Sequence, residues 1–122
     1  MSHERKTCDA PLDVVAALAD PDVRAILTAT SEKPQTVSEL VDRCEIPTAT
    51  AYRKTDDLVE AGLLQERLLV RPSGRNAREY VCPISDVRVA IDGSGTLHVE
   101  CLIEPDERNP TAASDETATN RP

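Results

Sequence analysis

Arg53 stands among polar side chains that could form specific hydrogen bonds with a partner. The group is Thr48, Thr50, Tyr52, Arg53 and Lys54. An arginine can donate two hydrogen bonds to O6 and N7 of guanine, and a threonine hydroxyl can bond to phosphate or to the edge of a base. If the segment is helical, its N-terminus also favours a phosphate. These residue types suit the reading of base edges in a DNA major groove.

A second group of basic residues follows shortly after the first. Its members are Arg67, Arg71, Arg75 and Arg78, within twelve residues that contain no acid. Arginines at the tip of a hairpin can follow phosphates or enter a narrow minor groove. The alternative interpretation is a solvated surface, or ion pairs with Glu66 and Glu79.

Asp56, Asp57 and Glu60 follow Arg53 in the same segment and would repel phosphate. If this segment is a helix, its DNA contacts should therefore come from its first half.

The distribution of charge favours this region over the rest of the chain. The 122 residues carry a net charge of -8, yet residues 47–78 hold six basic and four acidic residues. Only Lys6, Lys33 and Lys54 of the 14 basic residues are lysines, a composition that resembles the proteins of a high-salt cytoplasm. The overall acidity is therefore interpreted as an adaptation to solvent, and it does not exclude a nucleic-acid partner.

Catalytic and metal chemistry have little support in the sequence. Cys8, Cys44, Cys82 and Cys101 form no C-x-C or C-x-x-C pair, and the chain has no glycine-rich phosphate loop and no recognisable catalytic pair. We expect a protein that is not an enzyme and needs no metal or cofactor. Its thiols would be small buried side chains, with a thiol sensor or a metal site assembled in space as alternatives.

No apolar run reaches the roughly 18 residues of a membrane span, and the N-terminus lacks the apolar core of a signal peptide. We therefore expect a cytoplasmic protein. Residues 1–10 are predicted to be a flexible leader, residues 11–103 one domain, and residues 104–122 a disordered acidic tail.

The segment from Thr36 to Gly62 should position the first group of residues. Thr36 and Glu39 form a T-x-x-E capping box, and Glu45 and Ile46 should make a turn before a second helix that starts near Pro47. That helix should run to about Ala61, with Gly62 as its stop. Thr48 or Thr50 would serve the free N–H groups of its first turn.

Further elements are expected on both sides. Two helices precede residue 31, a loop follows at 31–35, a hairpin of the wing type covers 63–82, and a second hairpin pairs 85–91 with 97–103. Val87, Val89 and Ile91 should point inward. The predicted core is Leu12, Val15, Val23, Ile26, Leu27, Val37, Leu40, Val41, Leu58, Leu63 and Leu68. The fold class is thus α+β, with about four helices, a wing and an additional C-terminal β-hairpin.

The combination of ALADPDVRAIL, TVSELVDRCEIPTATAYRKTDDLVEAGLL and the following hairpin resembles ArsR-type winged helix-turn-helix transcriptional regulators of the halophilic-archaeal kind. The resemblance covers roughly residues 12–82. It implies that the second motif helix enters the major groove and that the wing contacts the backbone or minor groove. The groove-facing and wing residues would be Thr48, Thr50, Tyr52, Arg53, Lys54, Arg71, Arg75 and Arg78.

Two departures from that family pattern matter. Thr55 and Asp57 stand where it usually has apolar residues, and its paired-cysteine metal signature is missing from SELVDRC. We predict a sequence-specific regulator that binds double-stranded DNA as a homodimer, through the second hairpin or the N-terminal helix. The alternative is a winged-helix module that docks on another protein. The operator, the effector and the direction of regulation do not follow from the sequence.

Overall fold

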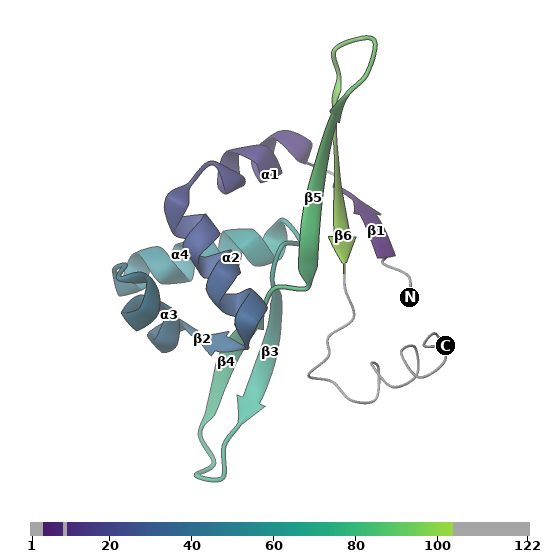
Figure 1. Ribbon diagram of the computed structural model, residues 1–122. Helices are drawn as coiled ribbons and strands as arrows, with labels where there is room; N and C mark the ends of the chain where they lie inside the picture. Colours follow the sequence, from purple (N-terminus) through teal and green to yellow (C-terminus); the bar gives the residue numbers. More distant parts are fainter. Residues whose placement is uncertain (1–3, 9, 104–122) are drawn as a thin grey trace.

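The computed structural model describes residues 4–8 and 10–103, which form a mixed α+β fold of four helices and two three-stranded sheets (Figure 1). The predicted tail at 104–122 lies outside the described residues. The helices are α1 (Pro11–Leu18), α2 (Pro21–Glu32), α3 (Val37–Cys44) and α4 (Thr48–Glu60). The strands are β1 (Glu4–Thr7), β2 (Gln35–Thr36), β3 (Gln65–Val70), β4 (Asn76–Val81), β5 (Ile84–Ile91) and β6 (Leu97–Ile103).

Helices α3 and α4 are the two helices predicted between Thr36 and Gly62. The capping box is confirmed, because Glu39 N donates to Thr36 Oγ1 at 3.2 Å and Thr36 N donates to Glu39 Oε1 at 2.8 Å. Glu45 ends α3 in the left-handed conformation, with φ of 57°. This residue turns the chain toward α4 within three residues.

Helix α4 begins and ends by different means. Pro47 is the N-cap, and neither Thr48 nor Thr50 supplies the expected side-chain cap. At the other end Gly62 has φ of 84°, Leu63 N donates to Leu58 O at 2.9 Å, and Gly62 N donates to Val59 O at 3.0 Å. These bonds form a Schellman motif and confirm Gly62 as the stop.

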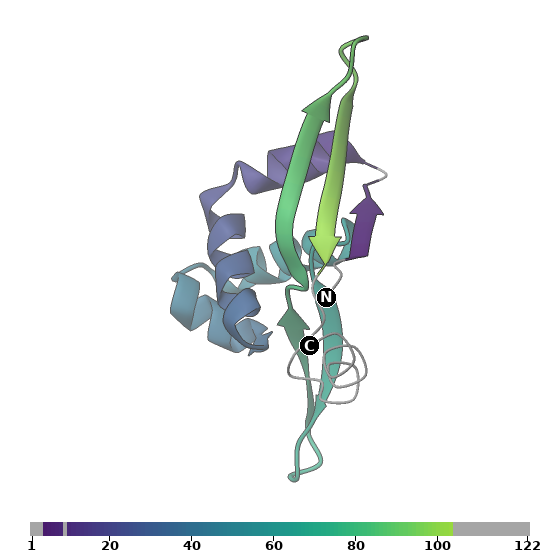
Figure 2. The same cartoon turned by 45° about the vertical axis from the view of Figure 1, so that its right-hand side comes forward.

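The two sheets are antiparallel and have the strand orders β2-β4-β3 and β1-β6-β5. The β3–β4 and β5–β6 hairpins extend in opposite directions from the helices (Figures 1 and 2). Strand β2 joins the helices to the first sheet, since Thr36 pairs with Glu79 and also caps α3. The orientation of the β3–β4 hairpin is therefore linked directly to the start of α3.

The core lies where the helices meet the bases of both hairpins. Its buried residues include the predicted Val23, Ile26, Val37, Leu40, Leu58 and Leu63, while the predicted Leu27 and Val41 are partly buried beside it. Val14, Leu64, Tyr80, Val99 and Cys101 are also buried. With Phe and Trp absent, aliphatic side chains and Tyr80 fill the interior.

The predicted inward face of α1 was wrong. Leu12 is 70% exposed and Val15 is 37% exposed, whereas Val14 is 1% exposed. A short alanine-rich helix offers two overlapping stripes at helical spacing, and the sequence does not distinguish them. Packing against β6 selects the stripe that contains Val14, with Ala17 and Leu18 partly buried.

Two strand faces were also predicted incorrectly. Leu68 is 62% exposed, because Leu63 and Leu64 are both buried at the end of α4 and the alternation restarts after them, with Arg67 and Leu69 as the half-buried positions. In β5, Val89 is 48% and Ile91 is 69% exposed. Both residues lie in the half of β5 that leads to the turn at 92–96, and the tip of the β5–β6 hairpin extends beyond the helices (Figure 1).

Two strands had no counterpart in the predicted elements. Glu4–Thr7, expected within a flexible leader, form β1 and pair with β6. Gln35, expected in a loop, belongs to β2 and pairs with Tyr80 of β4. Both strands are short, and their pairing is with distant parts of the chain, so local sequence patterns carried no signal for them.

We expect Leu58→Ala to lower the free energy of unfolding by about 2–5 kcal/mol, because Leu58 is 1% exposed and its loss leaves a cavity in the core. Leu68→Ala is the matched control, since its side chain is 62% exposed and should change stability by less than about 1 kcal/mol. Urea titrations followed by circular dichroism compare the two. Equal losses from both variants would contradict the assigned core.

Candidate nucleic-acid interface

The rotation of α4 is fixed by three buried residues, Ala51, Thr55 and Leu58. Thr55 is 0% exposed, and its hydroxyl donates to Ala51 O at 2.9 Å. The unexpected polar residue on the core side thus has an internal hydrogen-bond partner. Arg53 is two residues from both Ala51 and Thr55, about 200° around the helix, and so it points to solvent.

The five candidate residues of α4 are distributed around the helix. Thr48 and Arg53 are exposed, Tyr52 is 51% exposed, and Thr50 is half-buried. Lys54 lies on the opposite side from Tyr52, because two residues correspond to about 200°. A single flat surface cannot contact both Tyr52 and Lys54.

Lys54 forms an ion pair with Asp20, at the junction between α1 and α2. The side chains of Lys54 and Asp20 are 16% and 30% exposed. The hydrogen bond from Lys54 lowers the pKa of the Asp20 carboxyl below its ordinary value, and the bond from Asp22 N to the Asp20 side chain at 2.9 Å acts in the same direction. Asp20 therefore caps α2 and holds α4 against the junction of α1 and α2.

The tip of the β3–β4 hairpin presents two exposed arginines. Arg71 O accepts a hydrogen bond from Gly74 N at 2.9 Å, and Pro72 occupies the second position of this turn, as type I turns favour. Arg71 and Arg75 flank the turn and are exposed. Within residues 4–8 and 10–103 neither one has an ion-pair partner.

The strand arginines lie beside acids, as the alternative interpretation of this group proposed. Arg78 Nε is 3.2 Å from Glu66 Oε2, and Arg67 is 3.6 Å from Glu79 Oε1 across the β3–β4 pair. The side chain of Arg78 is still 64% exposed. The candidate residue Arg78 thus differs from Arg71 and Arg75 in having a neutralising neighbour.

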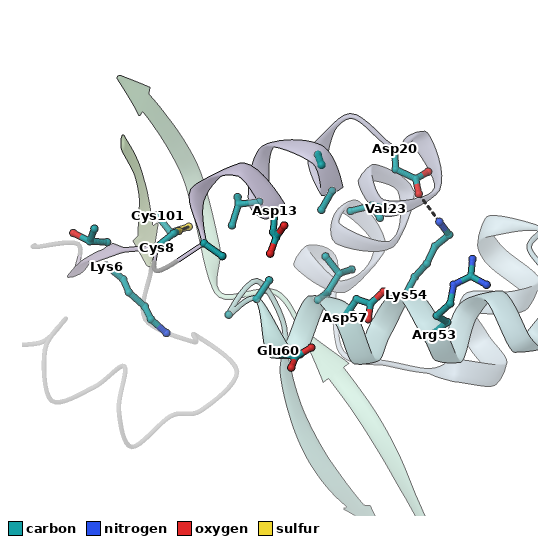
Figure 3. A pocket seen from close by; sticks show the side chains of 18 residues that line it. Lys6, Cys8, Asp13, Asp20, Val23, Arg53, Lys54, Asp57, Glu60 and Cys101 are labelled. Atoms are coloured by element: carbon teal, nitrogen blue, oxygen red, sulfur yellow. Dashed lines mark hydrogen bonds and ion pairs between the residues drawn. The ribbon is translucent and has the colours of Figure 1, made fainter. Parts of the chain in front are cut away.

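The C-terminal half of α4 is acidic at its surface, where Asp56, Asp57 and Glu60 are exposed. Asp57 and Glu60 line a cavity of about 700 Å³ between α1, α4 and β1, together with Asp13, Lys6 and the two thiols Cys8 and Cys101 (Figure 3). The Asp20–Lys54 pair and Arg53 also line this cavity, on the side away from Lys6, Cys8 and Cys101 (Figure 3). The first half of α4 carries Arg53 and no acid.

The part of the chain that the structure describes contains neither a metal-binding cluster nor a membrane-spanning helix. It holds no cluster of three or more His, Cys, Asp or Glu side chains suited to a metal ion. None of the helices there has the length and apolar character needed to cross a bilayer.

Comparison with known proteins agrees with this geometry at the level of the domain. Residues 18–67 match a family model described as a helix-turn-helix domain, a span that contains α2, α3 and α4. No curated protein matches the chain. The chain therefore contains a helix-turn-helix domain, the type of domain that DNA-binding regulators use.

We expect Asp20→Asn to lower the free energy of unfolding at pH 7, because asparagine keeps the cap of α2 but removes the charge opposite Lys54. The pKa of Asp20 is depressed in the folded state, so its contribution is complete above the ordinary value of 3.8 and is lost as the pH falls through the lower folded value. Urea titrations should show a difference from wild type at pH 7 that shrinks below pH 3.8. A difference that is constant with pH would contradict the ion pair.

Proposed function

We propose that this protein is a sequence-specific transcriptional regulator of the winged helix-turn-helix type. Helix α4 enters the major groove of double-stranded DNA, and the β3–β4 hairpin acts as the wing on the flanking backbone or minor groove. The protein acts in the cytoplasm and has no catalytic role, and DNA binding needs no metal or cofactor. The resemblance to ArsR-type regulators of halophilic archaea belongs to this proposal.

One observation carries the proposal most strongly. Arg53 and the hairpin arginines Arg71 and Arg75 are exposed on the helix-turn-helix unit and its adjoining hairpin. Base edges are read by a helix in the major groove, whereas phosphates fix orientation, so the two positions suit two different kinds of contact. Thr48 and Tyr52 are further exposed candidates for DNA contact on α4. Lys54 has a different role, because it holds the helix in place through its ion pair with Asp20.

We expect Arg53→Ala to cost about 1–3 kcal/mol of binding free energy on a cognate site and to relax base preference there. Arg75→Ala should weaken binding to all duplexes more evenly, and it should reduce the slope of log K against log salt by about one. Fluorescence anisotropy on cognate and scrambled duplexes, across a range of salt concentrations, measures both effects.

Arg88→Ala is the matched control, because Arg88 is an exposed arginine on β5, outside the helix-turn-helix unit and the β3–β4 hairpin. It should bind every duplex like the wild type. Equal, sequence-independent losses from Arg53→Ala and Arg75→Ala would refute the division between base reading and phosphate contact.

We also propose that the regulator is a homodimer that reads two half-sites about 34–36 Å apart, or a multiple of that spacing. The homodimer is supported by exposed apolar side chains on α1 and β5, which a subunit contact could cover. They are Leu12, Val15, Val89 and Ile91. Helix α1 contacts β6, and it begins beside the β5–β6 hairpin in both views (Figures 1 and 2). The two interfaces considered from the sequence, the N-terminal helix and the second hairpin, are therefore neighbours in the fold.

We expect Ile91→Asp to give a folded monomer, because Ile91 is 69% exposed in one copy and a charge would be desolvated at a subunit contact. Val70→Asp is the matched control, since Val70 is also 69% exposed but lies on β3. Light scattering gives the mass, and circular dichroism reports folding. A wild-type protein that stays monomeric at high concentration and on DNA would refute the dimer. Val99 is not suitable for this test, because it is 1% exposed and belongs to the core.

A protein-docking module is the second candidate, and one observation favours it. Acids lie next to much of the positive charge, since Lys54, Arg67 and Arg78 have carboxylate neighbours and Asp56 and Asp57 follow Arg53 on α4. Selection of duplexes from fragmented genomic DNA, with non-specific duplex as competitor, separates the two candidates. Recovery of a common sequence supports the regulator, and recovery of none supports the docking module.

A further inference from the structure

We propose that Cys8 and Cys101 form a reversible intramolecular disulfide, which small-molecule disulfides generate and which fastens β1 to β6. The two Sγ atoms are 3.4 Å apart, although the residues are separated by 93 positions in the sequence. A disulfide requires about 2.05 Å between the sulfur atoms, so the thiols need to approach by roughly 1.4 Å. The proposal is independent of whether the protein binds DNA.

The register of the sheet explains this proximity. Lys6 pairs with Cys101, and Cys8 N donates to Val99 O at 3.0 Å, so the antiparallel pattern continues to Cys8. Cys8 is therefore opposite Val99 and diagonal to Cys101 on the same face of the sheet. Diagonal side chains on neighbouring strands are close enough to interact.

The other two cysteines have different surroundings. Cys44 lies on α3, away from the sheet that holds the pair, and Cys82 Sγ donates weakly to Ile84 O at 3.8 Å. Cys82 is close enough to Cys101 to influence its pKa, which makes it the only rival partner among the described residues. Peptide mapping by mass spectrometry separates the two pairings.

Access and reactivity differ between the two thiols of the pair. Both line the cavity of about 700 Å³, and Cys8 is half-buried whereas Cys101 is 3% exposed (Figure 3). Burial and the hydrogen bond with Cys8 raise the pKa of Cys101 to about 12, which disfavours its thiolate. Cys8 is therefore the thiol that reacts first, and Cys101 is the thiol that resolves the intermediate.

The reaction is an ordinary thiol–disulfide exchange with a reagent RSSR. The Cys8 thiolate attacks one sulfur of RSSR, forms a mixed disulfide and releases RS⁻, which takes up the proton that Cys8 lost. The Cys101 thiol then loses its proton and attacks Cys8 Sγ, and the second RS⁻ leaves as RSH. Two protein thiols are oxidised, and one RSSR is reduced to two RSH.

The disulfide would act on more than the edge of a sheet. Lys6, two residues before Cys8, has its ammonium group beside Gly62, the residue that ends α4. A covalent link at Cys8 would hold this contact and would limit the movement of one wall of the cavity. The redox state of the pair would thus reach the C-terminal end of α4.

The test treats the full chain with oxidised glutathione, alkylates the remaining thiols and maps the peptides by mass spectrometry. We expect a linked pair of peptides containing Cys8 and Cys101, with Cys44 and Cys82 alkylated, and full reversal by dithiothreitol. Cys101→Ser should accumulate a glutathione adduct on Cys8, whereas Cys8→Ser should give no adduct on buried Cys101. Cys44→Ser is the control and should form the link like the wild type.

Several results would overturn the proposal. They are a link to Cys82, a link between two chains, four alkylated thiols after oxidation, or equal alkylation of Cys101 in the oxidised Cys8→Ser variant and in the oxidised wild type. Circular dichroism checks the fold of each variant. Peptide mapping of the wild type decides the matter even if Cys101→Ser, which alters a core position, does not fold.

Discussion

The buried contact surface of α4 is the constraint on which the rest of the molecule depends. Ala51, Thr55 and Leu58 enter a core shared with Ile26 of α2 and Leu40 of α3, and each of the five side chains is at most 1% exposed. Removal of so much apolar surface from water fixes the rotation of the helix. The outward direction of Arg53 follows from that rotation, because a helix has no freedom to turn one residue independently of its neighbours.

Two further contacts convert this local constraint into a defined spatial arrangement. Asp20 caps α2 and pairs with Lys54, so the same carboxylate orders one helix and anchors another. Thr36 caps α3 and also pairs with Glu79 of β4. The hairpin that carries Arg71 and Arg75 is therefore attached directly to the start of α3. Helix and hairpin are consequently presented by one connected framework, and neither depends on a long flexible loop.

The sequence predicted those parts of the fold that depend on local chemistry. The capping box at Thr36 and the left-handed glycine at Gly62 determine helix ends within a few residues, and both were read correctly. The missed features depend on distant partners. Strand β1 requires β6, and the choice between Val14 and the Leu12–Val15 stripe requires the same sheet.

Prediction of the candidate site has the same limit. Residue types and spacing selected Arg53 and the hairpin arginines as candidates, but they did not predict the ion pair of Lys54, whose partner is 34 residues away in sequence. The proximity of Cys8 and Cys101 could not be predicted either, because it arises from a strand pairing that the sequence pattern did not indicate. Periodicity describes a single element, whereas these contacts are properties of two elements brought together.

Chemical-shift mapping can locate the surface of the protein that DNA contacts. Backbone amide resonances of the ¹⁵N-labelled protein should be followed while a selected duplex is added. We expect the largest shifts in the first half of α4, around Thr48 to Arg53, and at the hairpin tip between Arg71 and Arg75. Shifts confined to α1 and the β5–β6 hairpin, or no shifts at a salt concentration where binding is measured, would contradict this expectation.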